Sequence, residues 1–218
     1  MASTSMPRDH LSSRPPELKL EIFRHLPTAS SVHNLSVASK VFRRFLDEHH
    51  DSIVRSLANK IVKPECVKLA VMAIESRAVN PDDGKSVQQF IDTYMNHDKL
   101  TKQQLCLRVV DRMPALHHAI LSAIDLGFPT AVDLSPRDQK LVLQSHYVLE
   151  TFSNLYNSFK SLATTKEIGF RFVYHPNYPW PAQFWAHFSQ SELEVVCKVG
   201  QLLYEHGTRI KDYLLFVA

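Results

Sequence analysis

Histidine is the residue type that first suggests chemistry in this sequence, because 12 of the 218 residues are histidine. Imidazole groups that converge can hold a metal ion or transfer protons. The adjacent pairs His49-His50 and His117-His118 would point about 100° apart on helices, and no His-x-x-x-His or H-E-x-x-H motif is present. We therefore interpret the histidines as surface or singly hydrogen-bonded residues, and we expect no metal site and no cofactor.

The nucleophilic residues give no stronger signal for catalysis. The sequence has no G-x-S-x-G motif, and each of its three cysteines lies on an apolar helical face, where buried thiols are usually inert. They are Cys66, Cys106 and Cys197. Such widely spaced cysteines indicate a reducing compartment, so we expect a cytoplasmic or nuclear protein. We predict that it is not an enzyme; the alternative, a helical enzyme using the histidines, requires a pocket where several polar side chains converge.

The scarcity of glycine limits the elements that could position such residues. Only 5 residues are glycine, against an average usage of about 7%, which disfavours both tight β-turns and glycine-rich phosphate-binding loops. A hydrophobic content of 44% with 22% charged residues is typical of a globular chain. No apolar run approaches the ~18 residues of a membrane span, and a net charge of +3 is too small to indicate nucleic acid. We expect an all-α protein with neither a membrane nor a nucleic-acid partner.

Apolar residues recur at helical spacing between the prolines. After a polar tail over residues 1–10, the segment from Pro15 to Pro27 predicts a first helix. Its apolar positions are Leu18, Ile22 and Leu26. Residues 28–46 predict two short helices, with Ser30 or Ser31 as the cap of the first and a bend near Ser39.

Further helices are predicted downstream. Residues 51–62 form one, and Pro64 opens the next. Thr101 and Gln104 have the spacing of a capping box and predict the start of another helix, which Pro114 either kinks or restarts.

The clearest predicted element is one long helix over about residues 136–163. Ser135 precedes Pro136, which is the arrangement of an N-cap before a proline at the first helical position. The apolar face is too wide for a coiled-coil seam, so we expect other helices to pack around this one. Ser189 and Glu192 form a second capping box and predict a last helix, with Gly200 in its interior.

The segment between these two helices combines prolines with large aromatic side chains. Rigid aromatic residues are typical of interface hot spots, so we predict a target-binding role for four of them. They are Tyr174, Tyr178, Trp180 and Trp185. The alternative is a loop that folds back over the end of the long helix, because large aromatic side chains more often fill a core.

Residues 14–46 resemble an F-box, the short helical module that docks a substrate receptor onto the Skp-family adaptor of a cullin-RING ubiquitin ligase. The segments "RPPELKLEIFRHLP" and "LSVASKVFRRFL" follow the family pattern of a Leu-Pro-x-Glu-Leu opening, an Ile-(Leu/Phe) pair, a Leu-Pro and a basic-x-aromatic ending. Arg14 stands where the family has its leading leucine, and Phe42 where many members have tryptophan. The resemblance implies a three-helix module over 11–50 and the following adaptor-binding residues: Pro15, Leu18, Ile22, Phe23, Leu26, Pro27, Val37 and Phe42.

Two further stretches resemble the C-terminal region of fungal F-box proteins. They are "LSPRDQKLVLQSHYVLETFSNLY" at 134–156 and "FWAHFSQSELEVVCKVGQLL" at 184–203. The resemblance implies a helical C-terminal domain over 51–218, with no leucine-rich or WD repeats.

The resemblance implies a non-catalytic substrate receptor that links an unknown target protein to a Skp-cullin-type ubiquitin ligase. The alternative is an F-box-like interaction protein that acts outside a ligase, with its apolar patch closed against its own C-terminal helices. Three short helices bury little surface among themselves, so either partner surface is consistent with the apolar pattern.

Overall fold

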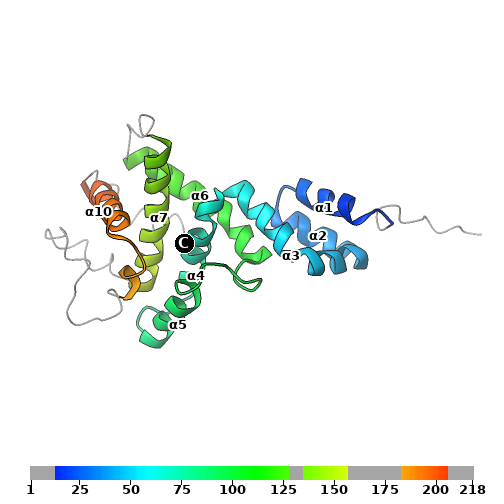
Figure 1. Cartoon of the computed structure of the whole chain (residues 1–218), viewed down its shortest axis with the longest axis horizontal. Coiled ribbons are helices and arrows are strands. Elements are labelled where there is room, and N and C mark those ends of the chain that lie inside the picture. Colours follow the sequence, from blue (N-terminus) through cyan, green and yellow to red (C-terminus); the bar gives the residue numbers. More distant parts are fainter. Residues whose placement is uncertain (1–12, 128–134, 157–182, 206–218) are drawn as a thin grey trace, which may run out of the picture.

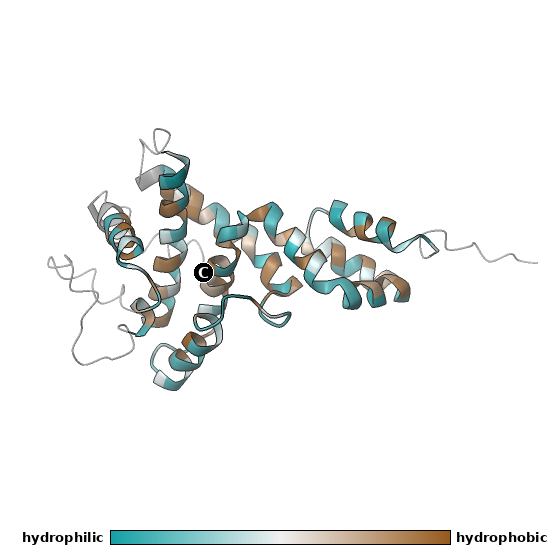
Figure 2. Cartoon of the chain, in the orientation of Figure 1, coloured by the Kyte–Doolittle hydropathy of each residue, from teal (hydrophilic) through white to brown (hydrophobic). Residues whose placement is uncertain are grey.

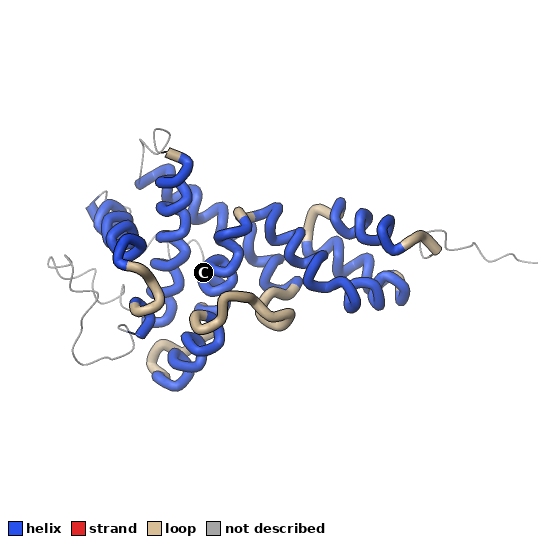
Figure 3. The backbone as a smooth tube through the Cα atoms, in the orientation of Figure 1, coloured by secondary structure: helices blue, strands red, loops and turns tan. Residues whose placement is uncertain are grey.

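The computed structural model describes residues 13–127, 135–156 and 183–205. The tail over 1–10, the predicted continuation of the long helix over 157–163, and the aromatic residues Tyr174, Tyr178 and Trp180 lie outside these ranges. The described secondary structure is helical and contains no strand (Figure 3). The prediction of an all-α fold is therefore confirmed.

Several helices begin at or near the prolines and serines that the sequence singles out. The described elements are α1 (Pro16–His25), α2 (Ala29–Ala38), α3 (Lys40–Ile61), the single 3-10 turn η1 (Pro64–Cys66), α4 (Val67–Ser76), α5 (Gly84–Tyr94), α6 (Leu107–Gly127), α7 (Pro136–Tyr156) and α10 (Gln190–Glu205).

The helices are arranged along an elongated molecule (Figure 1). α1, α2 and α3 lie at one end, α7 and α10 lie at the other, and α4 and α6 connect the two. Apolar and polar residues alternate in bands along the helices, as amphipathic packing requires (Figure 2). A continuous apolar core extends from Phe23 in α1 to Tyr147 in α7, and a second core surrounds Phe152.

Helix α1 begins where the sequence predicts, whereas α2 begins at Ala29, ahead of the predicted cap at Ser30 or Ser31. Pro16 occupies the first turn of α1, and the Thr28 side chain caps α2 by accepting the Ser31 N–H at 3.1 Å. Ser39 has extended dihedral angles (φ −141°, ψ 125°) and separates α2 from α3, which is the predicted bend.

Helix α3 differs from the prediction because it continues past the expected break. A separate helix was predicted over 51–62, whereas α3 runs from Lys40 to Ile61 with one non-helical residue, His49 (φ −113°, ψ 19°). Apolar side chains on both sides of this kink enter the same core, so packing keeps the two halves in one element. The predicted boundary between residues 50 and 51 consequently falls inside α3.

The predicted capping box before α6 forms, but it does not start the helix. The Thr101 N–H donates to Gln104 Oε1 at 2.7 Å, and the Gln104 N–H donates to Thr101 Oγ1 at 3.4 Å. Gln104 Nε2 also donates to the Thr93 carbonyl of α5 at 2.8 Å. The box therefore closes a turn that is tied to α5, and α6 begins later, at Leu107, and continues through Pro114.

Helix α7 has the central position predicted for the long helix. It begins at the predicted cap, where the Ser135 hydroxyl accepts the Asp138 N–H at 3.2 Å, and it packs against α4, α6 and α10. An ion pair joins it to the end of α4, with 2.8 Å between Arg77 Nη2 and Glu150 Oε1. The Glu150 side chain is only 2% exposed.

Within the described ranges, none of the helices combines the length and the apolar character that crossing a bilayer requires.

Gly200 provides a test of the contact between α7 and α10. A Cβ added there would lie 3.9 Å from Leu149 Cδ2, an ordinary van der Waals distance, so the packing does not require glycine. Because alanine is favoured over glycine inside a helix by about 0.5–1 kcal/mol, we expect Gly200→Ala to raise the free energy of unfolding by that amount. Urea denaturation measures this change, and a loss of stability would contradict the described separation of the two helices.

His146 makes the stability of the fold depend on pH. Its side chain is buried in α7, where Nδ1 donates to the Val142 carbonyl at 2.8 Å, and burial lowers its pKa to about 4. The unfolded chain, with a histidine pKa of about 6.5, therefore takes up the proton first as the pH falls, and stability is lost between about pH 6.5 and 4.

We expect this proton linkage to disappear in His146→Leu. Over that pH range the wild type should lose up to about 3 kcal/mol of unfolding free energy more than the variant loses. Urea denaturation at a series of pH values gives both slopes, and the comparison does not depend on the absolute stability of the variant. Equal slopes in the two proteins would show that His146 is protonated equally in both states.

Candidate functional site

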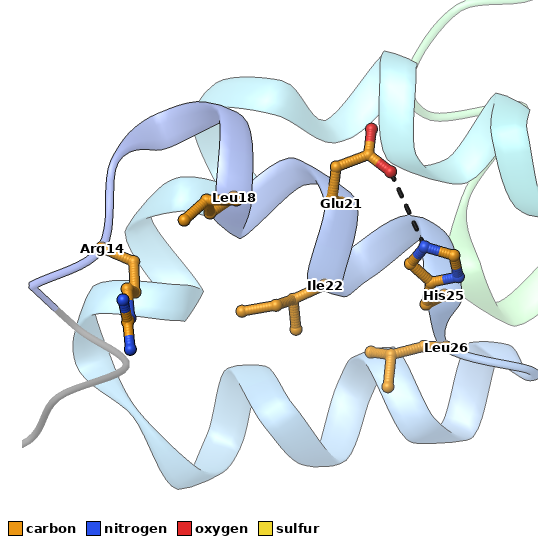
Figure 4. Close-up of a pocket in the computed structure, with 6 residues that line it drawn as sticks. All are labelled: Arg14, Leu18, Glu21, Ile22, His25 and Leu26. Atoms are coloured by element: carbon orange, nitrogen blue, oxygen red, sulfur yellow. Dashed lines mark ion pairs between the residues drawn. The ribbon is translucent and has the colours of Figure 1, made fainter.

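The outer side of α1 carries an open groove of about 490 Å³. Leu18, Ile22 and Leu26, which we call the leucine row, lie along it, because residues four positions apart share one face of a helix (Figure 4). Arg14 lies near the Leu18 end of the row. Leu18 is 47% exposed, and Ile22 and Leu26 are half-buried. The groove therefore presents an apolar stripe to solvent.

Polar side chains border this stripe. Glu21 accepts a hydrogen bond from Arg24 Nη1 at 2.8 Å, and His25 Nε2 lies 3.8 Å from the other Glu21 carboxylate oxygen (Figure 4). All three side chains are largely exposed, so these pairs contribute little to stability. An apolar centre with a charged border is the general composition of a protein-docking surface.

Phe23 lies about 100° around α1 from Ile22 and is fully buried, and Ile22 and Leu26 pack partly buried against the same core. Its ring is 5.7 Å from the Phe42 ring, edge to face, and 6.0 Å from the Phe45 ring, stacked, both measured between centroids. The resemblance implied that Phe23 and Phe42 contact an adaptor, but the structure places both inside the three-helix module. A docked protein could not reach these rings in this conformation; they support the groove from within.

The remaining residues implied by the resemblance are at the surface. Pro15 and Pro27 are exposed at the two ends of α1. Val37 is 57% exposed near the end of α2, and Val41 is 40% exposed at the start of α3. Of the large apolar side chains that the structure describes, only Leu121 is also strongly exposed, so most of this exposure is in the first three helices.

Sequence reasoning missed Val41, Glu21 and His25 as surface residues of this module. Val41 lies about 100° around the helix from Phe42, at the edge of the apolar face that Phe42 shares with Phe45 and Leu46, and it stays exposed while Phe42 is buried. That difference in direction is the signal that could have identified Val41. Glu21 and His25 are also four residues apart, which places them together beside the leucine row.

A second hollow lies over α3 and the end of α1. Its lining residues are Arg24, Asp51, Ser52, Arg55, Ser56, Asn59 and Lys60. This surface brings several polar side chains together but includes neither histidine nor cysteine. The reading of the chain as a helical enzyme depends on histidines, and this hollow does not provide them.

The buried histidine and cysteine side chains have packing roles. His117 Nδ1 and the Tyr147 hydroxyl are 2.8 Å apart, and burial lowers the pKa of His117 while it raises that of Tyr147. Both groups are therefore neutral at pH 7, and their hydrogen bond joins α6 to α7. Burial also raises the pKa of Cys66 to about 11, which suppresses the reactive thiolate. No cluster of three or more potential metal ligands occurs in the described residues.

Trp185 is the one member of the predicted target-binding set that the structure describes. It is buried, and its ring centroid is 4.6 Å from that of Phe152 in α7. Phe184 is fully buried beside it, 5.6 Å from the same ring. These contacts agree with the alternative in which this part of the segment folds against the long helix.

Comparison with known protein families gives a match over part of the chain. Residues 15–51 match the F-box domain family. Comparisons with curated proteins and with solved structures give no match.

The matched range covers α1, α2 and the part of α3 that ends just after the kink at His49. It contains the leucine row, the phenylalanine cluster and the exposed Val37 and Val41. Sequence resemblance, the family match and the three-helix geometry therefore agree on the same segment: residues 15–51 form an F-box domain.

Proposed function

We propose that this protein is a substrate receptor of a Skp-cullin-type ubiquitin ligase. An F-box implies binding of a Skp-family adaptor, and the receptor role extends that binding to a target protein. The observation that carries the proposal is the groove lined by the exposed Leu18 and the half-buried Ile22 and Leu26 within the F-box. Removing such side chains from water stabilises a complex by about 25 cal/mol for each Å² buried.

The position of the groove supports a docking role. Its lining comes only from residues 14–26, so no described helix after α1 contributes to it. An adaptor could approach α1 without displacing any described element. This arrangement disfavours the alternative in which the patch closes against α4, α5, α6, α7 or α10.

The elongated shape is consistent with adaptor binding at one end and target binding at the other. The F-box lies at one end of the molecule, and α7 and α10 lie at the other (Figure 1). We propose that the C-terminal helices recruit or position the target, while a ubiquitin-conjugating enzyme brought by the ligase performs the catalysis. F-box domains are generally non-catalytic, and the proposal assigns no catalytic residue to this chain.

Two finer parts of the interpretation stay predictions. One is the fungal type of the C-terminal region, inferred from residues 134–156 and 184–203. The other is target binding by Tyr174, Tyr178 and Trp180; Trp185 is better explained by its packing on Phe152.

The proposal predicts that the double substitution Leu18→Ala with Ile22→Ala weakens adaptor binding. We expect an affinity loss of at least about tenfold, because centrally placed apolar residues are typical binding hot spots. Titration calorimetry of the full chain with a purified Skp-family adaptor measures this loss.

Leu121→Ala is the matched control, because Leu121 is 42% exposed on α6, outside the groove. It should leave the affinity unchanged, and circular dichroism should show that all variants stay folded. A wild-type chain that does not bind the adaptor, or a double variant that binds as tightly as the wild type, would overturn the proposal.

A further inference from the structure

Helix α1 is anchored by one fully buried side chain and by Leu20, Ile22 and Leu26, which pack partly buried against the core. Phe23 is the one buried side chain among its ten residues, and its N-cap, Pro15, makes no side-chain hydrogen bond. An isolated helix of this length is marginal in water, so its position depends on contacts with the rest of the protein. Leu18, Ile22 and Leu26 all depend on that position, because they project from α1 or its C-cap.

The C-terminal end of α1 receives a cation from a distant part of the chain. Lys60, in the last turn of α3, donates through Nζ to the Arg24 carbonyl and, at 3.2 Å, to the Leu26 carbonyl. The last carbonyl groups of a helix have no partner within the helix and carry partial negative charge. An ammonium group at this position satisfies both needs.

The basic residues of α1 itself do not replace this contact. Arg24 directs its guanidinium to Glu21 at 2.8 Å, and His25 also faces Glu21. The Arg24 and His25 side chains thus point toward the Glu21 carboxylate at the exposed surface. Lys60 therefore supplies the cation that these carbonyl groups receive.

The Lys60 contact bears directly on the groove. The Leu26 carbonyl that accepts from Lys60 belongs to the same residue whose side chain ends the leucine row. Lys60 also follows the kink at His49, whereas the Phe23 ring of α1 contacts Phe42 and Phe45, which precede it. The contact thus ties the docking helix to the part of α3 that continues into the body of the protein.

We propose that Lys60 is a positioning residue for adaptor docking, acting through the last turn of α1 without lining the groove. This inference rests on the proposed function. Because Lys60 lies outside the matched F-box range of 15–51, the docking surface depends on a residue beyond the domain that presents it.

Lys60→Met tests the proposal, because it removes the ammonium group and keeps a long apolar side chain. We expect the affinity for a Skp-family adaptor to fall about threefold to fivefold, and backbone amides of α1 to exchange hydrogen correspondingly faster, while α7 is unchanged. Lys60→Arg should restore most of the affinity, because a guanidinium can donate to the same carbonyls.

Arg55→Met is the matched control. Arg55 and Lys60 both line the polar hollow over α3 and the end of α1, and the two substitutions make the same charge change. It should alter neither affinity nor exchange. Lys60→Met should also cost less in a Leu26→Ala background, because residues that act through one contact are not additive.

Three results would overturn the proposal. The first is an equal loss of adaptor affinity in Lys60→Met and Arg55→Met, which would show that only the net charge matters. The others are faster amide exchange in α1 with unchanged adaptor affinity, and affinity losses of Lys60→Met and Leu26→Ala that add fully. If the wild type binds no adaptor, the proposed function fails, and the exchange of α1 amides decides separately whether Lys60 holds the helix.

Discussion

The contact of Phe23 with Phe42 and Phe45 determines how the first helix is oriented. A ten-residue helix with a broad apolar face cannot bury every residue of that face equally against two neighbours. The aromatic cluster selects the side that carries Phe23, and the gain from burying large rings makes this choice strongly favourable. Leu18 is then left exposed, and Ile22 and Leu26 stay half-buried at the edge of the same core. The exposed surface and the buried cluster are therefore two results of the same packing choice.

The rest of the chain uses buried polar contacts to define how its helices meet. The Arg77–Glu150 pair fixes the end of α4 against α7, and the His117–Tyr147 hydrogen bond fixes α6 against the same helix. A buried ion pair adds little net stability, because removing both charges from water costs about as much as their attraction returns. Its physical effect is to penalise other registers, in which a charge would be buried without a partner. Apolar side chains alone would tolerate such a slide more easily.

The sequence predicted the helices best where local chemistry determines the outcome. The caps at Ser135 and Ser189 and the bend at Ser39 depend on a few neighbouring residues, and all three form. Where the observed helix boundaries differ from the predicted ones, tertiary contacts determine the outcome. Core packing keeps α3 continuous across His49, and a hydrogen bond to α5 uses Gln104 in a turn before α6. The depth to which each apolar residue of α1 is buried could not be predicted, because Phe23 lies only about 100° from Ile22 and both belong to one broad apolar face.

The continuity of α3 has a consequence for how the domain can be studied and exchanged. Ending the chain after residue 51 would cut this helix in the middle and remove Ile53, Val54 and Leu57, which belong to the same core as Phe23. The severed piece would lose half of its supporting helix. The family match thus marks a unit of recognition that is smaller than the unit of folding. Grafting this F-box onto another protein would require α3 and the surfaces that cover it to be transferred together.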